Sequence, residues 1–186
     1  MDIAAIAVLV LLLAPFCLRA QGVAQPSPST IPVVAAQSAP VVDATRLIPL
    51  LPDAPAGWSA DKPEGSTSQS EGFQITTVSR TYVKGDADNA PTATINIIDS
   101  ANNRQFQDAT KAMWSIPSNT PQGYDKAMTV AGLPGFEHFA YADQTGVLWV
   151  IVGGRFFVQV ETTRQPASEL ETWLARLDLK KLSALK

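Results

Sequence analysis

An α+β fold is predicted by three features of this sequence. Several segments alternate apolar and polar residues, two segments have helical spacing, and one long apolar segment is interrupted by a pair of glycines. Alternation at period two is typical of antiparallel strands, and helices with one apolar stripe pack against such a sheet. We expect about six antiparallel strands and two main helices. The chain of 186 residues is long enough for one ordinary domain and short for two.

The N-terminus predicts export. Residues Ile3–Leu18 are almost continuously apolar and are followed by Arg19 and Ala20, which fits a signal peptide over residues 1–20 that is cleaved before Gln21. An uncleaved anchor is one alternative, although its sixteen residues would span only about 24 Å of a hydrocarbon core of about 30 Å. A lipoprotein cut at Cys17 is another. The leading prediction places the mature protein in the periplasm or outside the cell.

Residues 21–45 are predicted to form a flexible tether. The stretch Gln21–Val42 contains four prolines and no charge, and repeated prolines remove backbone donors and prevent a helix. A spacer is the leading interpretation, and a proline-rich ligand for another protein is the alternative. The globular domain is then expected over residues 46–186. At its start Asp43 is placed to cap a short helical turn, and Trp58 is expected to pack on the core or to stack on a ligand.

The elements of the domain follow from the local patterns. Polar residues Ser59–Gly72 predict a loop with a weak strand near its end, and Asn102–Ser115 predicts a helix. Strands are predicted from alternation in four further segments: Phe73–Val83, Thr92–Ser100, Tyr124–Val130 and Phe136–Tyr141. Residues 131–135 are expected to form the turn between the last two.

The longest apolar segment of the domain, Val147–Thr162, predicts a central hairpin with a two-residue turn at Gly153-Gly154. In that register one face of the hairpin is wholly apolar and consists of Val147, Trp149, Ile151, Phe156, Val158 and Val160. After the hairpin, Ser168 and Glu171 are spaced as a capping box. They begin a helix whose apolar stripe is Leu170, Trp173, Leu174 and Leu177, and Asp178 is placed to cap a last turn.

Composition excludes several kinds of function. Net charge is −3 and basic residues do not cluster, which argues against nucleic-acid binding. The single cysteine lies in the predicted leader, so the mature domain has no thiol chemistry. His138 is the only histidine, so a Cys/His zinc site lacks the ligands it needs. Histidine-dependent catalysis would have to use this one position. The acidic turn at Asp86 and Asp88 lacks the spacing of a calcium loop. We therefore expect no metal and no cofactor.

Several motifs resemble those of small, exported, uncharacterised bacterial proteins over Leu47 to Leu185. They are LPDAPAGW, TINIIDS, VAGLPGFE, GGRFFVQVE and LDLKKL. The element order is also similar to the PsbP-like α/β/α sandwich. The second face of the predicted hairpin supports this similarity, because it is too apolar for open solvent. The resemblance implies an accessory or assembly factor without catalytic residues, since no catalytic motif carries over.

Three hypotheses for the function follow. The first is an exported, monomeric, non-enzymatic domain that binds a protein or a small apolar ligand in the cell envelope. Its candidate interface residues are Trp58 and an exposed aromatic–cation pair at the hairpin tip, Arg155 with Phe157. The second is a hydrolase that uses His138 with a distant carboxylate. The third is a structural envelope protein anchored by an uncleaved N-terminal helix.

Overall fold

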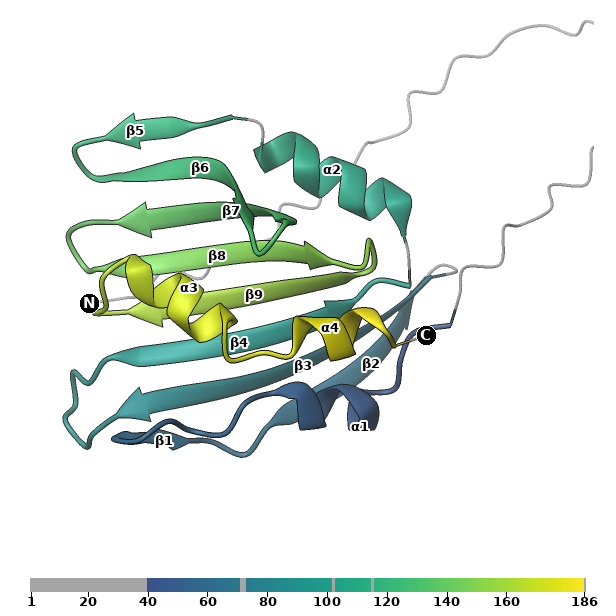
Figure 1. Cartoon of the computed structure of the whole chain (residues 1–186), viewed down its shortest axis with the longest axis horizontal. Coiled ribbons are helices and arrows are strands. Elements are labelled where there is room, and N and C mark those ends of the chain that lie inside the picture. The colour runs from purple at the N-terminus through teal and green to yellow at the C-terminus, as the bar shows by residue number, and fades with distance from the viewer. Residues whose placement is uncertain (1–39, 71–72, 102, 115, 186) are drawn as a thin grey trace, which may run out of the picture. The chain divides into compact units, whose positions relative to one another are not determined.

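The computed structural model describes residues 40–70, 73–101, 103–114 and 116–185. The predicted signal peptide and most of the predicted tether lie outside them. The described residues form a nine-stranded antiparallel sheet in the order β1-β3-β4-β9-β8-β7-β6-β5, with β2 pairing along the same edge of β3 as β1 (Figure 1). The strands are β1 Trp58–Ala60, β2 Glu64–Ser70, β3 Phe73–Lys84, β4 Thr92–Asp99, β5 Ser118–Thr120, β6 Gly123–Val130, β7 Leu133–Ala140, β8 Thr145–Val152 and β9 Phe156–Thr163. The helices are α1 Ala44–Leu47, the 3-10 turn η1 Ile48–Leu50, α2 Arg104–Trp114, α3 Ser168–Leu174 and α4 Leu179–Ser183.

The α+β class with an antiparallel sheet is confirmed, but the expected number of about six strands is wrong. β1 and β5 have three residues each, too few to show a period. β2 extends the predicted weak strand, and its polar sequence EGSTSQS has no apolar alternation because its described side chains are exposed at the sheet edge. The predicted turn at residues 131–135 is also too long, since β7 already begins at Leu133.

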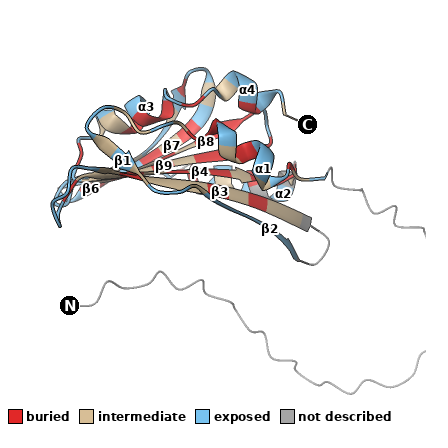
Figure 2. Cartoon of the chain, turned by 90° about the horizontal axis from the view of Figure 1, so that it is seen from below, coloured by how far each residue is buried: buried red, intermediate tan, exposed pale blue. Residues whose placement is uncertain are grey.

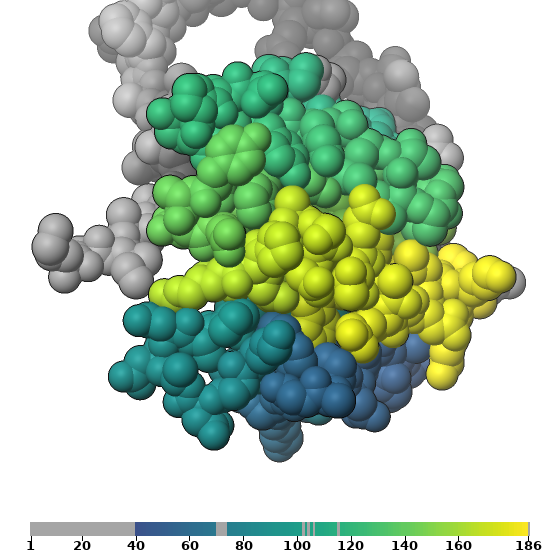
Figure 3. Space-filling model, turned by 60° about the vertical axis from the view of Figure 1, so that its left-hand side comes forward, coloured from purple at the N-terminus to yellow at the C-terminus, as the bar shows by residue number. Residues whose placement is uncertain are grey.

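One face of the sheet, here called the core face, is covered by α1, α3 and α4. The predicted stripe is confirmed within α3, where Leu170, Trp173 and Leu174 are buried. Leu177 is also buried but lies beyond the end of α3, which is shorter than predicted. The Trp173 ring lies 4.9 Å from that of Trp58 and 4.8 Å from that of Tyr82. Buried strand residues lie beneath α3 and α4 in Figure 2, and Figure 3 shows the C-terminal segment lying over the middle of the sheet. Burial of this face supplies most of the hydrophobic stabilisation.

Two of the three predicted helix caps are confirmed. The Asp43 carboxylate accepts a hydrogen bond from the Thr45 N–H at 2.8 Å, and the Asp178 carboxylate accepts one from the Lys181 N–H at 2.8 Å. The capping box at Ser168 is wrong. Ser168 is the first residue of α3, and Ala167 occupies the N-cap position of the helix. No side chain caps its N-terminus.

The central hairpin forms in a register that differs by one residue from the predicted one. Gly153 and Gly154 have φ of +60° and +65°, and the Arg155 N–H donates to the Val152 carbonyl at 3.1 Å, so the two-residue turn is present. Arg155 is then an extra residue, and pairing resumes with Val152 opposite Phe156. The predicted apolar face is therefore wrong. The hairpin residues on the core face are Leu148, Val150, Val152, Phe156, Val158 and Val160.

The extra residue is held in place by a buried ion pair. The Arg155 side chain is 8% exposed and pairs with Asp99 at the end of β4. Asp99 also accepts a hydrogen bond from the Val42 N–H at 2.6 Å, and Arg155 donates to the Pro40 carbonyl at 2.7 Å. Val42 is itself buried. The packed domain thus includes residues ahead of the predicted boundary at residue 46.

Candidate functional site

The second face of the sheet, here called the α2 face, is covered by α2 at one end. Among the α2 side chains that the structure describes, two are buried, Gln107 and Trp114. Trp114 packs against Ile151 and Phe157, and the Gln107 amide donates a hydrogen bond to the Gly154 carbonyl at the hairpin tip. The other described α2 side chains are exposed or half-buried. Beside these two side chains, space remains between helix and sheet.

That space is a hollow of about 320 Å³, here called the α2 hollow. Its walls are almost wholly apolar and consist of Thr110, Met113, Trp114, Phe136, Trp149 and Phe157. The rings of Trp114 and Phe136 are nearly parallel with centroids 6.1 Å apart. Met113 is 73% exposed, and Ile116, just beyond α2, is 72% exposed. An apolar, aromatic-lined concavity of this size is typical of a site for a small ligand.

The strands of the α2 face become more polar with distance from the hollow. Cross-strand pairing places Phe136, Trp149, Gln159, Asn96 and Ser79 side by side in one row. In the next row, two residues further along each strand, every residue except Val147 is charged or polar. The row consists of Asp125, His138, Val147, Glu161, Thr94 and Thr81. The α2 face therefore runs from apolar beneath the helix, through aromatic and amide groups, to carboxylates.

Hydrogen bonds connect these two rows. The Asn96 amide donates to the Gln159 side-chain oxygen at 3.4 Å, and the Gln159 amide in turn donates to the Glu161 carboxylate. Among the described residues, no donor bonds to the second carboxylate oxygen of Glu161. All three side chains are half-buried, so they remain within reach of a ligand.

His138 belongs to the charged row and contacts a carboxylate. Its Nδ1 lies 2.7 Å from Asp125 Oδ1, and the Ser118 hydroxyl donates to Asp125 Oδ2 at 2.8 Å. These two hydrogen bonds hold the pKa of Asp125 below its usual range. The carboxylate thus lies between serine and histidine, whereas a serine nucleophile requires the histidine between serine and carboxylate. The arrangement orders this corner of the sheet without activating Ser118.

Glu137, the neighbour of His138, points to the core face. Its carboxylate is 3% exposed and accepts a hydrogen bond from the Tyr124 hydroxyl, and Lys126 Nζ lies 3.0 Å from it. Tyr124 and Lys126 also border a broad depression of about 620 Å³ beside β5. The Lys126 charge is already neutralised by Glu137, so this cluster offers no free cation to a ligand.

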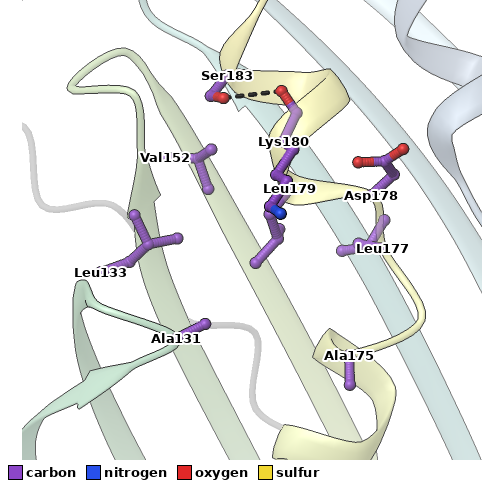
Figure 4. Close-up of a pocket in the computed structure, with 9 residues that line it drawn as sticks. All are labelled: Ala131, Leu133, Val152, Ala175, Leu177, Asp178, Leu179, Lys180 and Ser183. Atoms are coloured by element: carbon purple, nitrogen blue, oxygen red, sulfur yellow. Dashed lines mark hydrogen bonds between the residues drawn. The ribbon is translucent and has the colours of Figure 1, made fainter.

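A third hollow of about 450 Å³ lies on the core face between the β6–β7 turn and the α3–α4 connection (Figure 4). Leu133, Val152 and Leu177 line it, and two of its polar side chains, Asp178 and Ser183, bond to the backbone of α4. Asp178 caps that helix, and the Ser183 hydroxyl donates to the Lys180 carbonyl. It has no aromatic wall, so we regard the α2 hollow as the stronger candidate.

The predicted interface residues are placed differently from the expectation. Arg155 and Phe157 are 7% and 1% exposed, so the exposed aromatic–cation pair at the hairpin tip does not form. Phe157 instead lies at the base of the α2 hollow. Trp58 is half-buried against Trp173, with Lys84 Nζ 6.0 Å from its ring centroid. The sequence placed Trp149 in the core, and its role in the hollow follows only from the observed register.

Comparison of the chain with family models, with curated proteins and with solved structures found no match. Within residues 40–185, so far as they are described, no helix is long and apolar enough to cross a membrane. The same residues contain no group of three or more His, Cys, Asp or Glu side chains that could hold a metal ion.

Proposed function

We propose that this protein is a non-enzymatic accessory domain that binds a small apolar group in the α2 hollow. The observation that carries the proposal is the lining of the hollow, where two tryptophans and two phenylalanines surround an unfilled space. Partly exposed aromatic side chains supply contact area at a low cost in conformational entropy. Met113 at the rim is adaptable in shape, which suits a site that accepts flexible apolar chains.

We further infer that the protein is exported to the cell envelope and has a PsbP-like α/β/α arrangement. In the envelope it acts as a monomeric accessory or assembly factor. This inference is supported by the signal-like N-terminus and by helices that contact both faces of the sheet. N-terminal sequencing of the protein recovered from its native cells tests the export step. A start at Gln21 supports it, and a start at Met1 favours the anchored structural protein.

Titration calorimetry with decanol tests the binding proposal. We expect saturable binding with a negative heat-capacity change, because apolar surface is buried. Trp149→Ala should weaken binding on the order of tenfold, since it removes one wall of the hollow. Trp58→Ala is the matched control, because Trp58 is also a half-buried tryptophan but lies on the core face. Equal affinity of the wild type and Trp149→Ala would show that decanol binds elsewhere.

The hydrolase hypothesis has one observation in its favour, the contact between His138 and Asp125. It predicts that ester hydrolysis by the purified protein falls to background in His138→Ala. We expect no such loss, because the Ser118 hydroxyl bonds to the carboxylate and not to the imidazole.

A further inference from the structure

We propose that the ligand of the α2 hollow is an amphiphile with an ammonium group, whose apolar part lies under α2 and whose ammonium lies beside Glu161. This inference rests on the proposed function and adds the chemical class of the ligand. It is carried by the charges of the α2 face and by the position of Glu161 relative to the hollow.

The charged side chains of the strands are distributed unequally between the two faces. Among the strand residues that the structure describes, the α2 face includes the carboxylates Glu64, Asp125 and Glu161 but no lysine or arginine. The strand residues Arg80, Lys84 and Lys126 all lie in the opposite register, on the core face. The carboxylates of that face, Asp99 and Glu137, are paired with Arg155 and Lys126. A ligand head that approaches the α2 face therefore meets negative potential, which favours a cation.

Glu161 is the carboxylate placed to meet such a head. It lies two residues from Gln159 and four residues from Phe157 on the same face of β9. At about 3.3 Å per residue, it is about 7 Å from the aromatic row and about 13 Å from the base of the hollow. An extended alkyl chain of about ten carbons covers that distance.

The surroundings of Glu161 lack a cationic partner. Its cross-strand neighbours are Thr94 and Val147, and none of the ion pairs between described residues involves it. Trp149 is its diagonal neighbour across the β8–β9 pair. A carboxylate beside an indole is a favourable environment for an ammonium ion, which is attracted to both the charge and the ring face.

The test compares three ten-carbon ligands below their micelle concentrations: decylammonium, decanol and decyl sulfate. We expect decylammonium to bind about fivefold more tightly than decanol in low salt and decyl sulfate to bind more weakly than either. Glu161→Gln should remove the preference for decylammonium over decanol. Glu171→Gln on the exposed surface of α3 is the matched control and should leave that preference unchanged.

The possible results separate the two proposals. If decanol does not bind, both the proposed function and this inference fail. If decanol binds but decylammonium binds no more tightly, the hollow is a binding site and only the ammonium assignment is overturned. A preference for ammonium that persists in Glu161→Gln would place the head group at another carboxylate and refute the role of Glu161.

Discussion

Arg155 and Asp99 form a two-point ion pair inside the domain, with Arg155 Nε 2.8 Å from Asp99 Oδ1 and Nη2 2.7 Å from Oδ2. The pair joins the tip of the β8–β9 hairpin to the end of β4. Asp99 also accepts the Val42 N–H, so the N-terminal segment is fixed at the same point. Parallel hydrogen bonds of this kind specify geometry as well as adding energy. This contact explains why Arg155 is the extra residue that sets the hairpin register.

Removing one partner of the ion pair should destabilise the domain strongly. We expect Arg155→Met to lower the free energy of unfolding by about 3–5 kcal/mol, because Asp99 is left charged and buried. Urea unfolding followed by circular dichroism measures the change.

A double variant serves as the control for that measurement. Arg155→Met combined with Asp99→Asn removes both charges and should recover part of the lost stability. If the double variant loses more free energy of unfolding than the two single variants lose together, the buried charge is not the cause of the loss.

Replacing Gly154 or Gly123 with alanine should lower the free energy of unfolding by different amounts. Gly154→Ala places a side chain at φ +65° with nothing within 4 Å of its Cβ, so we expect a loss of about 1 kcal/mol from backbone strain alone. Gly123→Ala brings its Cβ into a clash with the Phe139 carbonyl oxygen, which must move. Its loss in urea unfolding should be at least twice as large, and a smaller loss would mean that the β6–β7 pair yields easily.

Tyr82 should make stability sensitive to alkaline pH. Burial raises its pKa from 10.0 to about 12, and its hydroxyl donates to the Pro52 carbonyl at 2.7 Å. Because the folded pKa is higher than the unfolded one, the contribution is complete below pH 10 and is lost as pH rises toward 12. The wild type should therefore lose more stability than Tyr82→Phe between about pH 9 and pH 11, by about 1 kcal/mol. Urea unfolding of both proteins at each pH measures the two losses. An equal loss in both would show that Tyr82 is not the group that causes the alkaline sensitivity.

Asp125 should have the opposite dependence at acidic pH. Hydrogen bonds from His138 and Ser118 lower its pKa in the folded state, so its contribution is present above the unfolded value of 3.8 and is lost as pH falls through the folded value. Asp125→Asn should thus show a smaller decrease in melting temperature than the wild type below about pH 4. Asp143→Asn, at an exposed turn, is the control and should follow the wild type.

The fold could be predicted from sequence wherever one face of an element is buried. Ile95, Ile97 and Trp173 reveal their strand or helix through a regular period, and all are buried as expected. The hairpin register could not be predicted in the same way. Both faces of β8 are apolar, so the alternation fits either register, and the choice depends on Asp99, which is 56 residues from Arg155.

The candidate site depends on that same choice. In the predicted register Trp149 and Phe157 lie on opposite faces, and no aromatic hollow exists. In the observed register they share the α2 face and become two walls of one space. The pairing of Trp149 with Gln159, which places the indole on the more polar face, appears only in the observed register.

The pairing of β4 with β9 has a consequence for how the chain folds. Strands β5 to β9 form a meander in which each strand pairs with the next along the chain, and β2 to β4 form another. Only local contacts are needed to form each meander, whereas the β4–β9 seam must close a loop of more than fifty residues. We therefore expect the seam to form last and to set the folding rate, with the Arg155–Asp99 contact formed as the two halves meet.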